Sequence, residues 1–248
     1  MDRLTLSSKL VRRLEARLYT NRPGWVDGTL HFHRLCKSAI HRGDKILEIG
    51  AGPSNATSRF LATFAEVHGL DPDPDVRTND ALKTATVLQS ERYPFDDASF
   101  DACVSDYVVE HVPGGEAHLR EVARVLRPGG VYVFRTVNRL HYVALIARLT
   151  PHWFHVLVAN RARGNPEGTH DPYPTLYAMN TSRAVRRDAR KAGLVVDKVE
   201  FVEKEPAYAR FSILAFVILA AYERILNSTS VFGPLRANLF VVLRRPGS

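Results

Sequence analysis

The sequence has few cysteines and no recognisable secretory signal. Its 248 residues contain two cysteines, Cys36 and Cys103. Cys103 lies in an apolar stretch with the pattern of a buried strand, which favours a protein kept reduced inside the cell over a disulfide scaffold. The first residues are basic, but no apolar signal segment follows them. We therefore expect a cytoplasmic protein.

Long hydrophobic runs are also absent. The longest, FSILAFVILAAY at residues 211–222, is shorter than the roughly 20 residues that a membrane-spanning helix needs. It predicts a helix over residues 207–226. A buried helix is the simplest interpretation, and three alternatives stay open: a homodimer face, a wall against an apolar substrate, and a peripheral contact with a membrane surface.

Candidate metal ligands are scattered through the chain. His31 and His33 stand two residues apart, so that on a helix their side chains point in different directions. We expect no carboxylate partner near them. We therefore predict no metal site.

The charge balance is basic, but the basic residues are dispersed. Lysine and arginine number 34 against 26 acidic residues, which gives a formal net charge of +8. Such a balance is compatible with nucleic acid, an anionic membrane surface or an acidic substrate. The arginines occur in stretches such as LVRRLEARL and SRAVRRDARKAG, a pattern typical of solvated helix faces.

The most informative stretch is KILEIGAGPSNATSRF at residues 45–60. Its apolar start predicts a buried strand, and Gly50 and Gly52 predict a sharp turn. Ser54 or Asn55 can cap the helix that follows. Amide groups at such a helix start favour an electron-rich ligand.

The same stretch departs from the dinucleotide fingerprint. Asn55 occupies the position of its third glycine. Glu48, at the end of the strand, would repel a pyrophosphate and suits a ligand that carries an ammonium or sulfonium charge. Both residues disfavour an NAD-dependent oxidoreductase.

Strands alternate with helices along most of the chain. The expected strands lie at residues 45–50, 66–71, 84–89, 100–107, 131–138, 194–203 and 236–245. The expected helices lie at 4–20, 26–40, 55–65, 114–126, 181–193 and 207–226, with only a helical stub between the second and third strands. This alternation predicts an α/β fold with a doubly wound, mostly parallel sheet.

Four motifs carry a family resemblance. ILEIGAGPS, VHGLDPD, YPFDDASFDACVSDYVVEHV and LREVARVLRPGGVYVFRTVN occur in this order between about residues 44 and 138. They resemble the motifs of class I S-adenosylmethionine-dependent methyltransferases, and most closely the small-molecule branch with the type 11 methyltransferase domain. The resemblance implies a Rossmann-like fold with a seven-stranded sheet, and S-adenosyl-L-methionine as the cofactor.

The resemblance also implies where the cofactor binds. The strand end and glycine loop would face its methionine portion, Asp71 with Pro72 its ribose, Gln89 with Ser90 its adenine amino group, and Asp106 with Tyr107 its sulfonium and adenine. The predicted cofactor-binding residues are thus Glu48, Gly50, Ala51, Gly52, Asn55, Asp71, Pro72, Gln89, Ser90, Asp106 and Tyr107.

No repeat or low-complexity linker interrupts the sequence, so we expect one domain over residues 1–248. Its consecutive parts would be a helical N-terminal cap at 1–40, a cofactor-binding core at 41–140, a substrate-side insertion at 141–180, and C-terminal helices and end strands at 181–248. Segments above the carboxyl ends of the strands set specificity in such sheets. Candidate substrate-pocket residues are Asn138, His155, Tyr173, Tyr177 and Tyr208.

The expected activity is methyl transfer to a small-molecule or lipid- or saccharide-type acceptor, at oxygen rather than nitrogen or carbon. His170 and His111 are the candidate bases, with alignment of the reactants alone as the alternative. Two other functions stay open. A nucleic-acid methyltransferase is disfavoured because SDYVVEH stands where a PPY-type motif would follow the fourth strand. The other is a non-catalytic protein that binds S-adenosylmethionine.

Overall fold

The computed structural model describes residues 6–142, 144, 174–206, 209, 210 and 212–247. The chain divides into two compact units, each assembled from three separate stretches of sequence. We call them the sheet unit (Thr29–Arg139, Pro174–Glu200 and Asn238–Ser248) and the helical unit (Met1–Gly28, Leu140–Tyr173 and Phe201–Ala237). The division of one domain into consecutive segments stays a prediction.

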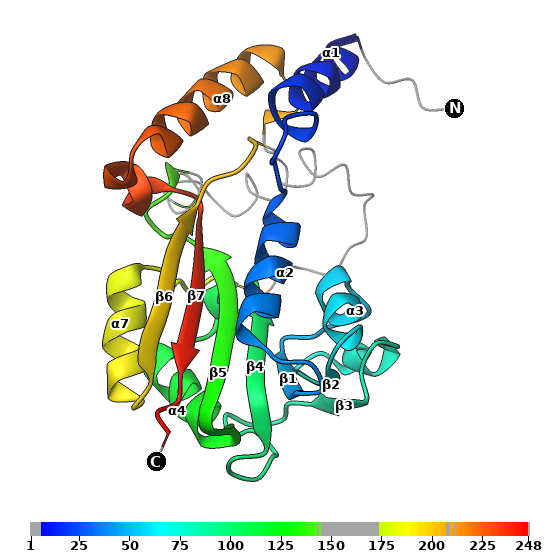
Figure 1. The fold of residues 1–248 in the computed structure, drawn as a ribbon, viewed down its shortest axis with the longest axis vertical. Helices are drawn as coiled ribbons and strands as arrows, with labels where there is room; N and C mark the ends of the chain where they lie inside the picture. The colour runs from blue at the N-terminus through cyan, green and yellow to red at the C-terminus, as the bar shows by residue number, and fades with distance from the viewer. Residues whose placement is uncertain (1–5, 143, 145–173, 207–208, 211, 248) are drawn as a thin grey trace. The chain divides into compact units, whose positions relative to one another are not determined.

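The described part of the chain contains one seven-stranded sheet, in the order β3–β2–β1–β4–β5–β7–β6 (Figure 1). Strands β1 to β5 pair in parallel, and β7 pairs antiparallel with β5. The predicted α/β fold with a mostly parallel seven-stranded sheet is therefore confirmed. The strands are β1 (Lys45–Ile49), β2 (Glu66–Asp71), β3 (Thr84–Val87), β4 (Phe100–Asp106), β5 (Leu126–Val137), β6 (Val195–Val202) and β7 (Asn238–Arg244).

The central strands are buried along both of their faces. In β1, Ile46 and Leu47 point to opposite sides of the sheet, and both are fully buried. The same holds for neighbouring residues of β4, such as Cys103 and Val104. Because helices cover both faces of a parallel sheet, its strands need nearly continuous apolar runs, which KILEI and DACV supply.

Helices lie on both faces of the sheet (Figure 1). On one face, His33 of α2 stacks on Phe60 of α3, with ring centroids 4.2 Å apart. On the other, His118 of α4 lies 2.9 Å from the hydroxyl of Tyr132 in β5. The helices are α2 (Gly28–Ala39), α3 (Ala56–Ala62), α4 (Gly115–Val125) and α7 (Ser182–Lys191), with short 3-10 turns η2 (Pro74–Thr78) and η3 (Val109–His111). The turn η2 is the stub expected between β2 and β3.

The helical unit is built on two helices with an apolar contact between them. They are α1 (Leu6–Glu15), which continues as the π turn η1 (Ala16–Thr20), and α8 (Ile213–Ser228), which is followed by the 3-10 turn η5 (Ser230–Leu235). Tyr19 packs edge-on against Phe216, with ring centroids 6.3 Å apart, and its hydroxyl donates to Glu223 at 3.0 Å. The buried core of this unit is Val11, Tyr19, Ala209, Phe216 and Ala220.

Helix α8 begins later than the sequence indicates. The prediction was a helix over residues 207–226, but α8 starts at Ile213, because Ser212 is extended (φ −144°) and its hydroxyl accepts from the amide of Ala215. Residues 209, 210 and 212 therefore lie outside the helix. The buried interpretation holds for one face only, since Leu214 is 69% exposed. Within the described ranges, no helix has both the length and the apolar character needed to cross a membrane.

Candidate functional site

The loop after β1 forms the centre of the candidate site. Gly50 and Gly52 adopt φ values of +74° and +51°, which side-chain-bearing residues rarely adopt. A Cβ on Gly50 would lie 2.2 Å from Cγ2 of Val108, so the backbone passes directly against the segment that follows β4. A Cβ on Gly52 would meet no atom within 4 Å, and Ala51 between them is buried. The loop is thus packed at one glycine and open at the other.

Asn55 connects this loop to helix α3. Its extended backbone (φ −137°) stands before the helix, and its side-chain oxygen accepts from the amides of Thr57 at 2.8 Å and Ser58 at 2.9 Å. Its side-chain nitrogen donates to the carbonyl oxygen of Ala51 at 2.8 Å. Of the two predicted caps, Asn55 is the residue that caps α3, and it also fixes the loop.

Glu48 is the last but one residue of β1 and is almost fully buried. Burial and the nearby carboxylates of Asp106 and Asp71 raise the pKa of its carboxyl group, and hydrogen bonding to Ser58 and Asn55 lowers it, with a net rise to about 7. Its Oε2 atom has no hydrogen-bond partner among the described residues. A buried carboxylate oxygen without a partner is costly, and a positively charged ligand would offset that cost.

Asp71 ends β2 beside the same loop. One carboxylate oxygen accepts from the amide of Gly52 at 2.9 Å, and the other accepts from the amide of Asp73 at 2.8 Å. Burial raises the pKa of Asp71 as well. Pro72, which follows it, is exposed. The carboxylate is therefore held in place by backbone donors at the end of the strand.

Asp106 ends β4 and is held by two side chains. It accepts from the hydroxyl of Thr57 at 2.6 Å and from Arg135 Nε at 2.5 Å. The Arg135 guanidinium lies over the rings of Phe32, at 5.0 Å, and Tyr107, at 4.6 Å. This ion pair is nearly buried and joins β4 to β5.

The sequence did not point to Arg135, Thr57 or the conformation of Tyr107. Tyr107 has φ +56°, and its hydroxyl donates to Asn238 of β7 at 2.9 Å. A charged residue inside the apolar strand VYVFRTV is the signal that could have singled out Arg135, because a buried charge needs a partner.

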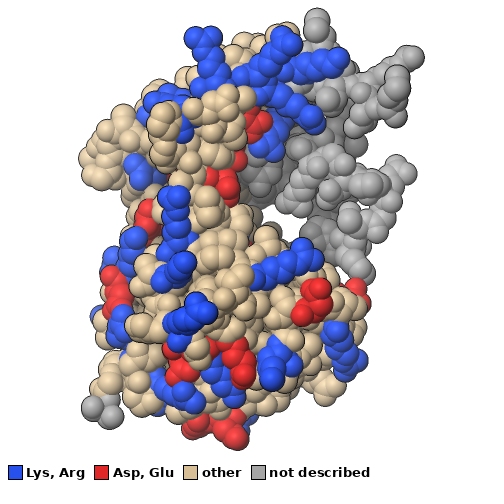
Figure 2. Space-filling model, turned by 45° about the vertical axis from the view of Figure 1, so that its right-hand side comes forward, with Lys and Arg blue, Asp and Glu red and all other residues tan. Residues whose placement is uncertain are grey.

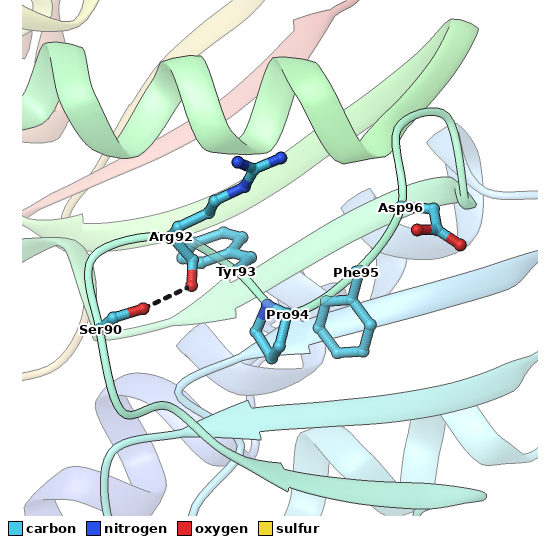
Figure 3. Close-up of a pocket in the computed structure, with 6 residues that line it drawn as sticks. All are labelled: Ser90, Arg92, Tyr93, Pro94, Phe95 and Asp96. Carbon is cyan, nitrogen blue, oxygen red and sulfur yellow. Dashed lines mark hydrogen bonds between the residues drawn. The ribbon is translucent and has the colours of Figure 1, made fainter.

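The predicted adenine-side residues are exposed. Gln89 and Ser90 follow β3 on the surface, and the Ser90 hydroxyl donates to the carbonyl oxygen of Arg92 at 3.1 Å. Ser90 also lines a cavity of about 300 Å³, which none of the three carboxylates described above reaches (Figure 3). The full lining is Ser90, Arg92, Tyr93, Pro94, Phe95 and Asp96. The candidate site therefore consists of the glycine loop and the carboxylates, and this cavity is separate from it.

His111 lies on the turn η3, after β4. Its Nδ1 atom is 3.2 Å from the carbonyl oxygen of Pro174. Tyr177, with φ +53°, donates its amide to the carbonyl oxygen of Glu110 at 3.1 Å, which brings this candidate substrate residue next to η3. Asn138, just beyond β5, is fully buried. His155, His170, Tyr173 and Tyr208 lie outside the described residues.

A buried polar cluster that the sequence did not indicate adjoins η3. Glu110 accepts from the hydroxyl of Thr136 at 2.8 Å, and Asn180 donates to the same hydroxyl oxygen at 2.6 Å and to the carbonyl oxygen of Val137 at 2.9 Å. Burial raises the pKa of Glu110. The cluster ties the segment after residue 174 to the end of β5, and so fixes the position of His111.

The two histidines of α2 point apart, as expected, but one of them has a carboxylate partner. His33 contacts the hydroxyl of Thr57 at 3.1 Å, whereas His31 lies 3.1 Å from Glu200. The expectation that no carboxylate is nearby was wrong, because β6 brings Glu200 to α2 from a distant part of the sequence. The residues that the structure describes contain no group of three or more His, Cys, Asp or Glu side chains able to hold a metal ion.

Comparison with known proteins finds one matching family model and several similar proteins. A family model described as a methyltransferase domain, of type 11, matches residues 47–134. The malonyl-[acyl-carrier protein] O-methyltransferase of Erwinia billingiae is 35% identical over 115 residues, which cover 42% of this chain and 46% of the relative. The ubiquinone biosynthesis O-methyltransferase of Paracidovorax citrulli is 27% identical over 209 residues, which cover 77% of this chain and 76% of the relative.

A solved structure has a similar fold. The phosphoethanolamine N-methyltransferase 2 of Haemonchus contortus, in complex with S-adenosyl-L-methionine, gives a TM-score of 0.55 at 18% identity, over 99% of this chain and 59% of that chain. This chain spans less than half the length of the first curated relatives that it matches. Residues 47–134 therefore match the methyltransferase domain family, and the sheet has the Rossmann-like fold of the solved methyltransferase structure.

Proposed function

We propose that the protein transfers a methyl group from S-adenosyl-L-methionine to an oxygen atom of a small-molecule, lipid-type or saccharide-type acceptor. The observation that carries the proposal is the buried carboxylate of Glu48, with its unpartnered Oε2 atom, in front of a two-glycine loop. The family match over residues 47–134 supports it. Two relatives named as O-methyltransferases support oxygen as the acceptor atom.

The residues present fit this cofactor. Glu48 would attract its positively charged methionine end, and the open side of Gly52 leaves room for a ligand beside the loop. A carboxylate can accept from both hydroxyls of a ribose, and Asp71 would do so at the end of β2. Gln89 and Ser90 would lie near the adenine, and Tyr107 beside the sulfonium. When bound, the cofactor supplies a methyl group on a sulfonium, which leaves a neutral thioether on transfer.

The chain would then orient the acceptor and remove its proton. His111 is a candidate base because it lies on η3 directly after β4, with its Nδ1 atom held 3.2 Å from the carbonyl oxygen of Pro174. His170 is the rival candidate. Asn138, His155, Tyr173, Tyr177 and Tyr208 are the proposed acceptor-contacting residues. If alignment alone drives the reaction, neither histidine is needed.

Calorimetry first tests which cofactor the protein binds. S-Adenosylhomocysteine should bind the wild-type protein, and NAD should not. Asp71→Ala should weaken binding by about 1–3 kcal/mol, the usual cost of leaving polar partners unmet. Asp71→Asn separates the loss of charge from the loss of shape, and Asp75→Ala, on the exposed turn η2, is the control. NAD binding more tightly than S-adenosylhomocysteine contradicts the proposal.

Turnover then separates an enzyme from a non-catalytic binder. With a cell extract as the source of acceptor, the wild-type protein should release S-adenosylhomocysteine. His111→Ala and His170→Ala are compared by kcat and by cofactor affinity. A base is identified by lost turnover with unchanged cofactor binding. Saturable, salt-dependent methylation of nucleic acid in place of small molecules would favour the nucleic-acid alternative.

A further inference from the structure

Helix α8 is apolar on two faces, and only one of them is covered. The inner face, with Phe216, Ala220 and Leu226, is buried. We call the exposed apolar side chains of the opposite face the outer stripe: Leu214 (69% exposed), Val217 (47%), Ile218 (56%), Ala221 and Ile225 (58%). Their spacing of three, four and seven residues places them on one side of the helix. We expect another molecule to cover this patch, because exposure of an aliphatic stripe to water is unfavourable.

Among the described residues of the same unit, the exposed charges are all positive. The acids that the structure describes in the helical unit are Glu15, Asp27, Glu203, Glu205 and Glu223, and none of them is in the exposed class. The exposed cations are Lys9, Arg12, Arg13, Arg17, Arg22, Arg210 and Arg224. Figure 2 shows Lys and Arg side chains gathered over α1, at the top of the view.

Two of these cations lie at the ends of the outer stripe. Arg210 precedes α8, and its side chain is 47% exposed although it pairs with Glu15. Arg224 stands next to Ile225, and its side chain is 42% exposed although it pairs with Glu223. The two arginines thus pair with the less exposed acidic side chains of Glu15 and Glu223, while their own side chains stay partly exposed to solvent. The outer surface of this unit therefore combines aliphatic side chains with positive charge.

We propose that the outer stripe of α8 and the exposed basic side chains of the helical unit dock on the surface of an anionic lipid bilayer. Acyl chains would cover the aliphatic side chains, and anionic headgroups would face the arginines and lysines. The helix has 16 residues and would lie along the interface. Binding through such a surface joins apolar burial to an attraction that salt weakens.

Charge and shape favour a lipid bilayer over a second copy of the chain and over nucleic acid. A second copy of the chain would bring two surfaces of the same sign together, which opposes association. Nucleic acid would match the charge, but Leu214, Val217 and Ile218 offer neither stacking nor hydrogen bonds to bases. Of these three, only a bilayer uses both the aliphatic stripe and the positive charge.

Vesicle co-sedimentation of the full chain tests the proposal. Vesicles of phosphatidylcholine with about one-third phosphatidylglycerol should bind the protein, and pure phosphatidylcholine vesicles should bind it weakly. Leu214→Asp with Ile218→Asp should abolish binding. Arg12→Gln with Arg13→Gln should reduce it by roughly fivefold for each residue, and raised salt should reduce it as well.

Matched variants in the sheet unit serve as controls. Val195→Asp changes an aliphatic residue of β6 that is 52% exposed, and Arg183→Gln with Arg186→Gln removes two exposed charges from α7. Both should leave vesicle binding unchanged, and circular dichroism should show every variant folded. All substituted positions are exposed, so loss of the fold is not expected.

Three outcomes overturn the proposal. The first is no binding to anionic vesicles, or equal binding by the Leu214→Asp, Ile218→Asp variant. The second is a dimer in sedimentation that this variant converts to a monomer while vesicles stay unbound, which assigns the stripe to a second copy. The third is tight binding to RNA without binding to vesicles, which assigns the basic surface to nucleic acid.

Discussion

Glu48 carries the strongest electrostatic conflict of the candidate site. Its carboxyl group is buried beside two other carboxylates, and its pKa is raised to about 7. A raised pKa in an acid means that the folded state binds the proton more tightly than the unfolded state does. Stability is therefore lost as pH rises from the unfolded pKa of about 4.5 through 7. A cationic ligand would relieve this conflict.

Replacing Glu48 by glutamine should remove the loss of stability that accompanies rising pH. Between pH 5 and pH 8 the wild-type free energy of unfolding should fall relative to that of Glu48→Gln, by up to about 3 kcal/mol. Urea unfolding at the two pH values measures the difference. Glu91→Gln, at an exposed position, is the control and should follow the wild type. Identical pH dependence of wild type and Glu48→Gln would show that Glu48 titrates normally.

The two glycines of the loop should respond differently to alanine. Gly50→Ala adds a Cβ 2.2 Å from Val108 at a positive φ, so strain and overpacking together should cost about 3 kcal/mol of unfolding free energy. Gly52→Ala meets open space and should cost about 1 kcal/mol through its backbone alone. Chemical denaturation compares them. Gly50→Ala with Val108→Ala should recover part of the loss, and an equal cost at both glycines contradicts the packing argument.

The local placement of single residues was predictable where a short motif determines it. Glu48, Gly50 and Asp71 stand in short segments whose pattern already indicates a turn or a strand end. Arg135 was not predictable in the same way, because its partner Asp106 is 29 positions away and becomes a neighbour only when β4 pairs with β5. An ion pair of this kind becomes buried only when the sheet forms, so neither strand sequence alone indicates it.

At the scale of elements, hydrophobic periodicity located the helices but not all of their ends. Helix α3 ends at Ala62 instead of reaching residue 65, and α8 starts at Ile213 instead of residue 207. The apolar run around α8 does not indicate where the helix starts, because the start is set by one side-chain hydrogen bond of Ser212. Boundaries depend on such single contacts, whereas the existence of a helix depends on many residues.

Substitutions at Asn55, the cap of α3, measure how much a single contact at a helix end contributes to stability. Asn55→Ala removes the acceptor for the amides of Thr57 and Ser58, and should lower the free energy of unfolding by about 1 kcal/mol. Asn55→Asp keeps the acceptor but loses the donor to the Ala51 carbonyl oxygen, so it should lie between Asn55→Ala and wild type. Urea titration ranks the three proteins. A fully stable Asn55→Ala protein would mean that packing alone sets the start of α3.

At the scale of the whole molecule, the chain forms two units from interleaved stretches of sequence. The stretches Met1–Gly28 and Phe201–Ala237 come together in the helical unit, although most of the sheet unit lies between them in sequence. Composition and periodicity carry no information on such long-range contacts. The seven-stranded sheet was predictable because strand and helix alternate locally, but the grouping of α1 with α8 depends on side chains more than 190 positions apart, such as Arg210 and Glu15.

The two units should respond separately to their proposed ligands. The proposed cofactor site lies within the sheet unit, whereas the proposed bilayer surface lies within the helical unit. S-Adenosylhomocysteine at about 100 times its dissociation constant should stabilise the state that binds it by about 2.7 kcal/mol. Hydrogen exchange should therefore slow over residues 46–58 and 66–72, where the ligand would contact the backbone, and change little over α8. Anionic vesicles should produce the reverse pattern, with protection along α8 and none at the glycine loop. If S-adenosylhomocysteine protects α8 as strongly as the glycine loop, its effect is not confined to the sheet unit, and the two proposed sites are coupled.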